Sequence, residues 1–288
     1  MSASTSAEPR GDGGPEDAAV TTPGEATTAD GSHDTAYSTY LALDTLLAIQ
    51  RPKTEQHDEL LFVIVHQIHE LWFKQLLHEL GNAQRSLASA ADGPALRALR
   101  RTRSIIRVLI TQIDVLESIT PEQFDAFREL LGGSGHQSAQ FREIEVVFGR
   151  SDRFAAEQFA PGSPDRKRIE GRLGEPALFD SLLRYLAASG YLPAPRGARV
   201  APDSPEIQKA LRAAYRDDGV AAQICERFVD LDQLLQEWRF RHSVLARRVI
   251  GDQTGTGGST GAAYLRESVF KPSFPALWHV RDTGWAAD

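Results

Sequence analysis

The sequence predicts an all-α protein built around two long, buried helices. Apolar side chains recur at steps of three and four residues over about 56–90, where one face carries Phe62, His66, His69, Phe73, Leu76 and Leu80. A second such run covers about 217–250, with Leu231, Leu234, Leu235, Trp238, His242, Leu245 and Val249 on one face. No convincing alternating strand pattern and no internal repeat of fixed period accompany them. These observations favour a helical fold.

The N-terminal part divides into a tail and two helices. Residues 1–34 are rich in small and polar residues and hold no aromatic residue, so we expect a disordered tail there. A short helix is expected from Tyr37 to about Gln50, before Pro52. The helix over 56–90 is apolar nearly all round, which predicts deep burial.

The remaining elements follow from periodicity and from start and stop signals. A helix is expected over 94–118, with Ile105, Ile106, Val108, Leu109, Ile113 and Leu116 inside. Thr120 and Pro121 open the next helix, which stops at the glycines of 132–135. Further helices are expected over 137–149 and 259–268, and the mixed stretch 150–205 indicates an insertion or cap. We therefore expect a tail (1–34) and a single all-helical domain (35–288).

Composition narrows the class of protein. The chain has 288 residues, of which 41% are hydrophobic and 25% charged, as in ordinary globular proteins. Its net charge of −7 argues against a general nucleic-acid binder. The single cysteine, Cys225, excludes an internal disulfide and fits a reducing compartment. No secretory pattern and no run of about 18 apolar residues is present, so we expect a soluble, cytoplasmic protein with no membrane partner.

Two inward histidines are the first candidates for chemistry. His66 and His242 lie on the apolar faces of the two long helices, and neutral imidazole is a common ligand of iron and zinc. Either histidine alone is more often a hydrogen-bonded core residue. The run that starts at His69 lacks the second histidine of a zinc-protease helix, and one cysteine cannot attach a c-type haem. Haem held by one histidine stays open.

An arginine and a glycine-rich run are the other candidates. Arg128 follows Phe124 and Phe127, and it is either a surface residue with a buried stem or a clamp for a carboxylate. The glycines of 255–261 follow a helix and lack the lysine of a phosphate-binding loop. They make either a flexible connection or, with the Thr256 hydroxyl, a site for a polar ligand.

Short motifs over residues 37–280 are similar, in order and spacing, to those of one known family. They comprise residues 37–50, 57–67 and 70–75, then Asp114 to Glu117, Phe127-Arg128, Gln137-Ser138 with 140–142, Arg241-His242 and 255–259. Each is weak alone, but together they are specific. On them the chain resembles the tryptophan 2,3-dioxygenase family. The resemblance implies an all-helical fold, haem b, O2 as co-substrate and a homotetramer built as a dimer of dimers.

The resemblance also implies roles for individual residues. His242 would be the proximal iron ligand, and His66 the distal histidine that faces the indole N–H. Pocket walls would be Phe62 and Phe124, and the carboxylate and ammonium of the substrate would meet Arg128 and Thr256. Haem-pocket residues would be Leu131, Ser134 and Gly135, and a neighbouring subunit would contribute Tyr37 and Tyr40.

Departures from the family pattern leave the reaction outcome open. Ile113 stands where members usually carry tryptophan, His136 replaces a phenylalanine, and the preceding glycine loop is one residue shorter. The leading interpretation is dioxygenation of L-tryptophan to N-formylkynurenine by ferrous haem. The alternatives are monooxygenation of tryptophan or a β-substituted (β-methyl) tryptophan to a 2-oxindole, and a haem sensor without turnover. Arg128 and Thr256 argue against the sensor, because haem storage does not need them.

Overall fold

All regular secondary structure in the described part of the chain is helical, which confirms the predicted fold class. The computed structural model describes residues 35–131, 137–150, 154–193, 204–251, 253 and 269–282. The predicted tail (1–34) and the predicted helix at 259–268 lie outside these residues. The chain divides into two compact units, with the boundary between Gln50 and Arg51. That residues 35–288 form a single domain stays a prediction.

The first unit contains two short helices instead of the one expected. Helix α1 spans Ala36–Leu41, and the Thr35 hydroxyl caps it by accepting a hydrogen bond from the Ser38 N–H at 3.1 Å. Ala42 then adopts a left-handed conformation (φ 49°), and α2 follows at Leu43–Leu47. A left-handed residue cannot continue a right-handed helix, so the expected helix is broken at Ala42.

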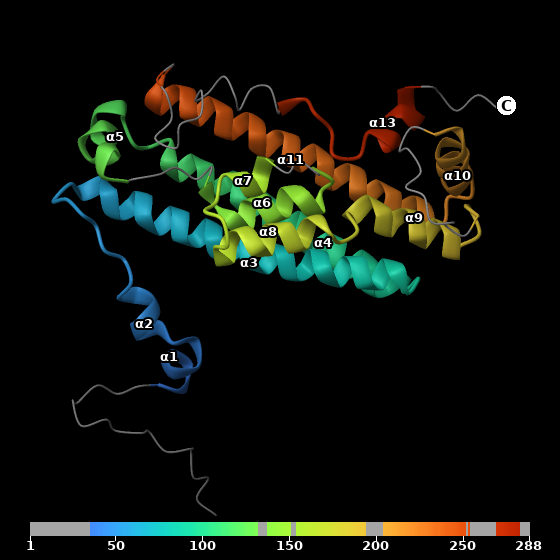
Figure 1. Ribbon diagram of the computed structural model, residues 1–288, viewed down its shortest axis with the longest axis horizontal. Coiled ribbons are helices and arrows are strands. Elements are labelled where there is room, and N and C mark those ends of the chain that lie inside the picture. Colours follow the sequence, from blue (N-terminus) through green and yellow to red (C-terminus); the bar gives the residue numbers. More distant parts are fainter. Residues whose placement is uncertain are drawn as a thin grey trace, which may run out of the picture. The chain divides into compact units, whose positions relative to one another are not determined.

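Three long helices form the frame of the second unit (Figure 1). They are α3 (His57–Ala88), α4 (Asp92–Leu116) and α11 (Val220–Ile250). Helix α4 packs along both α3 and α11. Its inner side chains Leu99, Ile106 and Leu109 are buried in the main core. The two helices that carry His66 and His242 are therefore held by a common neighbour.

Shorter helices cover this frame. They are α5 (Pro121–Arg128), the 3-10 turn η1 (Glu129–Leu131), α6 (Ala139–Val147), α7 (Phe154–Glu157), α8 (Pro164–Leu173), α9 (Leu178–Ala188), α10 (Pro205–Arg216) and α13 (Pro275–Asp282). The predicted start of α5 is confirmed, because the Thr120 hydroxyl accepts from the Gln123 N–H and the Gln123 amide oxygen accepts from the Thr120 N–H. Helix α6 packs on α3 and α8, and α10 packs on α11 and α13. None of the described helices is both long and apolar enough to cross a membrane.

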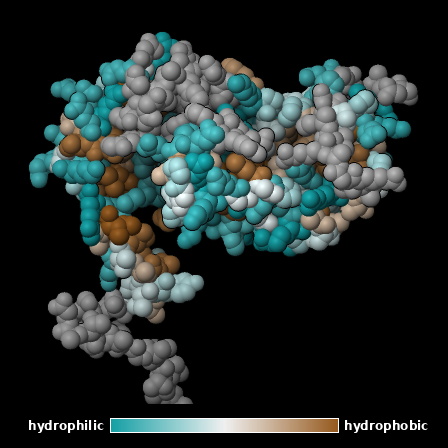
Figure 2. All heavy atoms as spheres, in the orientation of Figure 1, coloured by the Kyte–Doolittle hydropathy of each residue, from teal (hydrophilic) through white to brown (hydrophobic). Residues whose placement is uncertain are grey.

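The expectation that α3 is deeply buried all round is wrong for its first half. Leu76, Leu80 and Leu87 in the second half are buried. In the first half, Leu60 is 43% exposed and Leu71 is 52% exposed, and Ile64 lies between them on the same stripe. On α4, Val108 was expected inside and is 38% exposed. Figure 2 shows apolar residues reaching the surface among hydrophilic ones on the face in view.

One buried carboxylate fastens the C-terminal segment to α11. Asp232 is fully buried and accepts hydrogen bonds from the Ser273 N–H (2.8 Å), the Phe274 N–H (3.1 Å) and the Trp278 indole N–H (2.8 Å). The Phe274 ring lies 5.0 Å from that of Phe228. Because a buried donor without an acceptor is costly, Asp232 both satisfies and positions this segment.

We expect Asp232→Ala to lower the free energy of unfolding by about 3 kcal/mol, because one buried and two partly buried donors lose their acceptor. Urea denaturation followed by circular dichroism measures this change. The matched control is Asp230→Ala on the same helix, whose partly exposed ion pairs with Arg103 and Arg227 are worth about 1 kcal/mol or less. Equal effects of the two substitutions would contradict the anchoring role of Asp232.

Candidate active site

Histidines from α3 and α11 lie near one another. Burial, together with the nearby His66 and His69, lowers the pKa of His242 to about 4. His242 is therefore neutral at pH 7, which is the form that binds a metal. No described residue hydrogen-bonds its ring.

The two histidines of α3 have fixed tautomers. The Nδ1 atoms of His66 and His69 lie 2.8 Å from the backbone carbonyl oxygens of Phe62 and Val65, respectively. A carbonyl only accepts, so each Nδ1 carries the proton and each Nε2 is an acceptor. Burial lowers the pKa of both rings, which keeps them neutral. The pair thus offers two acceptors from one helix face.

Aromatic rings form a wall beside His66. The Phe62 ring centroid lies 4.0 Å from that of His66 and 5.6 Å from that of Phe124. Phe127, which is buried, contacts both phenylalanines at 5.6 and 5.5 Å. The structure therefore brings together three residues proposed for the site, His66, Phe62 and Phe124, and adds Phe127. Their roles toward a substrate stay predictions.

Arg128 lies at the end of α5 with its side chain only 12% exposed. Its guanidinium donates to the amide oxygen of Gln253, just beyond α11, and lies 3.9 Å from the Asp125 carboxylate. A solvated surface arginine would be far more exposed, so the surface interpretation is the weaker one. Gln253 was not recognised in the sequence, because nothing local marks a glutamine 125 residues away as the partner of Arg128.

Glu59, in the first turn of α3, holds the segment that leads into this helix. Burial would raise the pKa of this carboxyl, but hydrogen bonds from Lys53 and Thr54 outweigh burial and lower it. The Lys53 ammonium in turn donates to the Leu130 carbonyl at 2.9 Å. Half-buried Leu131 follows at the end of η1, so this network places it near the first turn of α3.

Two of the sequence motifs meet beside His242. The Arg241 guanidinium forms ion pairs with Asp114 and with Glu117, the latter at 3.1 Å. These carboxylates raise the pKa of Arg241. Ile113, next to Asp114, is buried. The motif at 114–117 therefore fixes the rotation of α11 against α4 at the histidine.

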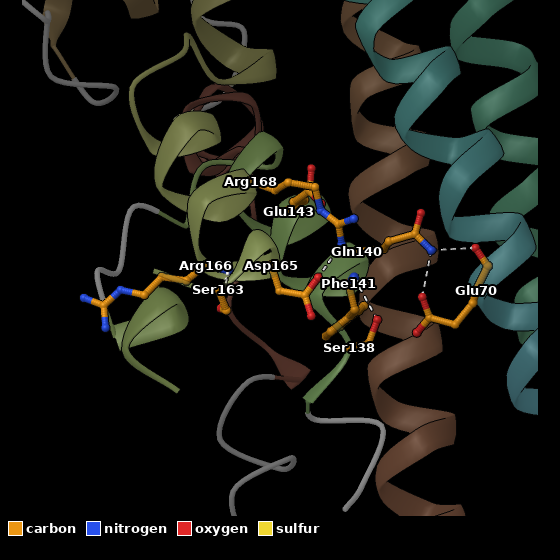
Figure 3. Close-up of polar contacts among 9 residues, drawn as sticks. All are labelled: Glu70, Ser138, Gln140, Phe141, Glu143, Ser163, Asp165, Arg166 and Arg168. Carbon is orange, nitrogen blue, oxygen red and sulfur yellow. Dashed lines mark hydrogen bonds and ion pairs between the residues drawn. The ribbon is translucent and has the colours of Figure 1, made fainter. Parts of the chain in front are cut away.

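A third motif ties α6 to the histidine helix (Figure 3). The Ser138 hydroxyl caps α6 by accepting from the Phe141 N–H at 3.1 Å. The Gln140 amide donates to the Glu70 carbonyl (2.9 Å) and to the Glu70 carboxylate (2.8 Å), one residue beyond His69. On the same helix, Glu143 pairs with Arg168 of α8 at 3.2 Å.

Two aromatic neighbours of the site were not assigned a role from the sequence. His69 was seen on the face of His66, and its ring lies 6.1 Å from that of Phe73. Trp238 was seen on the face of His242, and its ring stacks on the imidazole with centroids 5.2 Å apart. The spacing of four residues between Trp238 and His242 was the available signal, because such residues are neighbours on a helix.

Several proposed site residues lie either outside the described residues or in the first unit. Ser134, Gly135, His136 and Thr256 lie outside the described residues. Tyr37 and Tyr40 belong to the first unit, where their side chains are largely exposed. Their contribution to a neighbouring subunit stays a prediction.

The residues fit a haem group better than a chelated metal ion. Within the described ranges, no three histidine, cysteine or acidic side chains come together in a way that could hold a metal ion. A neutral His242 supplies the single imidazole that a haem iron needs from the protein. The Trp238 indole N–H is buried and finds no acceptor in the part of the chain that the structure describes, as expected where a bound group supplies one.

The described fold and site define a helical protein whose two long helices bring neutral histidines near one another, a donor set suited to haem. A sequence model of the tryptophan 2,3-dioxygenase family matches residues 23–159 and 206–283. The chain is 51% identical over 250 residues to tryptophan 2,3-dioxygenase of Anaeromyxobacter sp. (strain K), covering 85% of this chain and 94% of the relative. It is 45% identical over 253 residues to that of Herpetosiphon aurantiacus (85% and 96%), and 38% over 260 residues to that of Myxococcus xanthus (86% and 89%). The chain belongs to the tryptophan 2,3-dioxygenase family, which confirms the resemblance seen in the sequence and identifies it as an enzyme.

Proposed function

We propose that this enzyme uses haem b and O2 to dioxygenate the indole ring of L-tryptophan, giving N-formylkynurenine. The observation that carries the proposal is the placement of His242 near His66, whose ring packs on the Phe62–Phe124 wall. The curated relatives are named tryptophan 2,3-dioxygenases, which supports the same reaction here.

Each residue has a definable task in this reaction. His242 would hold the haem iron, with Leu131, Ser134 and Gly135 lining the haem pocket. Bound ferrous haem supplies the oxygen chemistry, and the protein positions the substrate. The bare Nε2 of His66 would accept the indole N–H, and the phenylalanines would exclude water from the ring.

The amino-acid part of the substrate needs separate contacts. Arg128 would bind the carboxylate, for which a guanidinium offers a planar fork of donors. Thr256 would hold the ammonium with help from a haem propionate. Gln253 occupies the guanidinium of Arg128 in this structure, so a bound carboxylate would share or replace that contact.

A second candidate function is monooxygenation of tryptophan or a β-substituted tryptophan. Ile113 favours it, because this buried side chain is smaller than the tryptophan that the family usually carries there, and it adjoins the Asp114–Arg241 pair beside His242. A smaller side chain leaves more room for a larger substrate. A haem sensor without turnover is disfavoured by the nearly buried Arg128.

We also propose self-association, with a homotetramer as the expected form. Leu60, Ile64 and Leu71 form an exposed apolar stripe on α3, and apolar surface of this kind marks protein interfaces. Tyr37 and Tyr40 are exposed within their own unit, as tyrosines that enter a partner's pocket would be.

The first prediction concerns the product. The reduced haem protein, given ¹⁸O₂ and L-tryptophan, should yield a product that contains two labelled oxygen atoms, measured by mass spectrometry. His242→Ala should lose the spectrum of histidine-ligated ferrous haem. One labelled atom would instead support the monooxygenase, and unchanged tryptophan would overturn both enzymatic proposals for this substrate.

The second prediction concerns Arg128. We expect Arg128→Ala to raise the KM for L-tryptophan by roughly 100-fold, because charge-assisted hydrogen bonds to the carboxylate are lost, with the haem spectrum unchanged. Gln253→Glu should also raise KM, because a carboxylate would compete for the guanidinium. The exposed Arg107 provides the control, and Arg107→Ala should leave KM unchanged. An unaltered KM in Arg128→Ala would remove the assignment.

The third prediction concerns assembly. Light scattering should give a mass of several chains for the wild-type protein. The pair Ile64→Lys and Leu71→Lys should shift the protein toward monomer, because charges on an apolar stripe disfavour contact. The matched pair Lys167→Glu and Arg107→Glu changes the charge of exposed residues on α8 and α4, away from the stripe on α3, and should keep the assembly. A wild-type monomer would contradict this proposal.

A further inference from the structure

Trp238 holds a distinctive place beside His242. The two residues are one turn apart on α11 and so share a face. Their rings stack with centroids 5.2 Å apart and an interplanar angle of 29°. The ring of Phe141 from α6 lies 5.1 Å from the indole, and Phe73 of α3 lies 5.7 Å from Phe141. Phe141 of α6, itself packed against Phe73 of α3, therefore holds the indole in place.

This stack does a task that hydrogen bonds usually do. A histidine that binds a metal normally donates its other ring N–H to a carboxylate, a carbonyl or water, which fixes the orientation of the ring. No described residue accepts from His242, whereas His66 and His69 each have a backbone carbonyl as partner. The plane of the His242 ring is thus set by the indole face.

The N–H group on the edge of the same indole needs a hydrogen-bond acceptor. The Trp238 Nε1–H is buried, and no acceptor for it exists among the described residues. Buried indole donors usually find a partner, since an unpaired buried donor is costly. Trp278 shows the usual solution in this chain, because its Nε1–H donates to the Asp232 carboxylate at 2.8 Å. Among the described residues, one indole thus has a carboxylate as its acceptor and the other has none.

We propose that Trp238 is a positioning residue of the haem site: its face orients His242, and its Nε1–H donates to a propionate carboxylate of the bound haem. The inference rests on the proposed function, because it needs haem on His242. Haem b offers few acceptors, because its ring nitrogens are bound to iron and its two propionates carry the free oxygens. A propionate supplies for Trp238 what Asp232 supplies for Trp278.

Two substitutions separate the two tasks. Trp238→Phe keeps an aromatic face and removes the N–H, whereas Trp238→Leu removes both. Haem loss is measured by transfer to excess apomyoglobin, and His242 is monitored by the iron–histidine stretching band of the ferrous protein. Trp278→Phe is the matched control, because it removes a paired indole N–H from the C-terminal segment.

We expect Trp238→Phe to lose haem about 10-fold faster or more, because a hydrogen bond to a charged group is lost, while the stretching band stays in place. Trp238→Leu should lose haem faster and also shift the band. Trp278→Phe should lower the melting temperature but change neither haem readout.

The hydrogen bond to the propionate and the orienting role of the indole face are refuted by different outcomes. Wild-type haem loss in Trp238→Phe would refute the hydrogen bond to the propionate. An unshifted band in Trp238→Leu would refute the orienting role. If His242→Ala binds haem with the wild-type band, the proposed iron ligand itself fails, which is a separate result from either of these.

Discussion

The packing of α4 against both α3 and α11 is the contact on which the rest of the structure depends. Helix α4 presents one apolar face along its length, and its buried isoleucines and leucines join the core on both sides. The burial of these side chains is the main source of stability in such a frame. It also fixes the distance between the helix that carries His66 and the helix that carries His242. The site is therefore a product of core packing before any polar contact is made.

Polar contacts then refine what the core has placed. Arg241 joins α11 to α4 beside His242, and Gln140 joins α6 to α3 beside His69. Asp232 holds the C-terminal segment against α11. Each of these residues makes more than one contact, Arg241 and Gln140 from a single nitrogen and Asp232 from both carboxylate oxygens, so each limits rotation as well as distance. A family motif that looks like scattered polar residues in the sequence is, in space, a set of helix-to-helix contacts.

Local rules predicted much of this from the sequence, and non-local contacts account for what was missed. The three long helices follow from periodicity, and the start of α5 follows from Thr120 and Pro121, because both signals act within a few residues. The break at Ala42 has no such signal, since alanine favours the helix interior. The exposed Leu60 and Leu71 look like core residues in the sequence, because an apolar stripe has the same residue pattern whether it faces the core or a partner. Within the site, His66, Phe62 and Phe124 were found from motif order, whereas Gln253 depends on a contact across 125 residues.

The tautomers of His66 and His69 have a consequence for proton traffic. The Nδ1–H of each ring donates a hydrogen bond to a carbonyl of the same helix, four residues earlier. A histidine passes a proton along a relay by taking it on one nitrogen and releasing it from the other, and here the second nitrogen leads only into the helix backbone. His66 and His69 therefore cannot relay a proton from Nε2 through Nδ1. Any proton that Nε2 accepts must therefore be released again from Nε2, because Nδ1 is already engaged with the helix backbone.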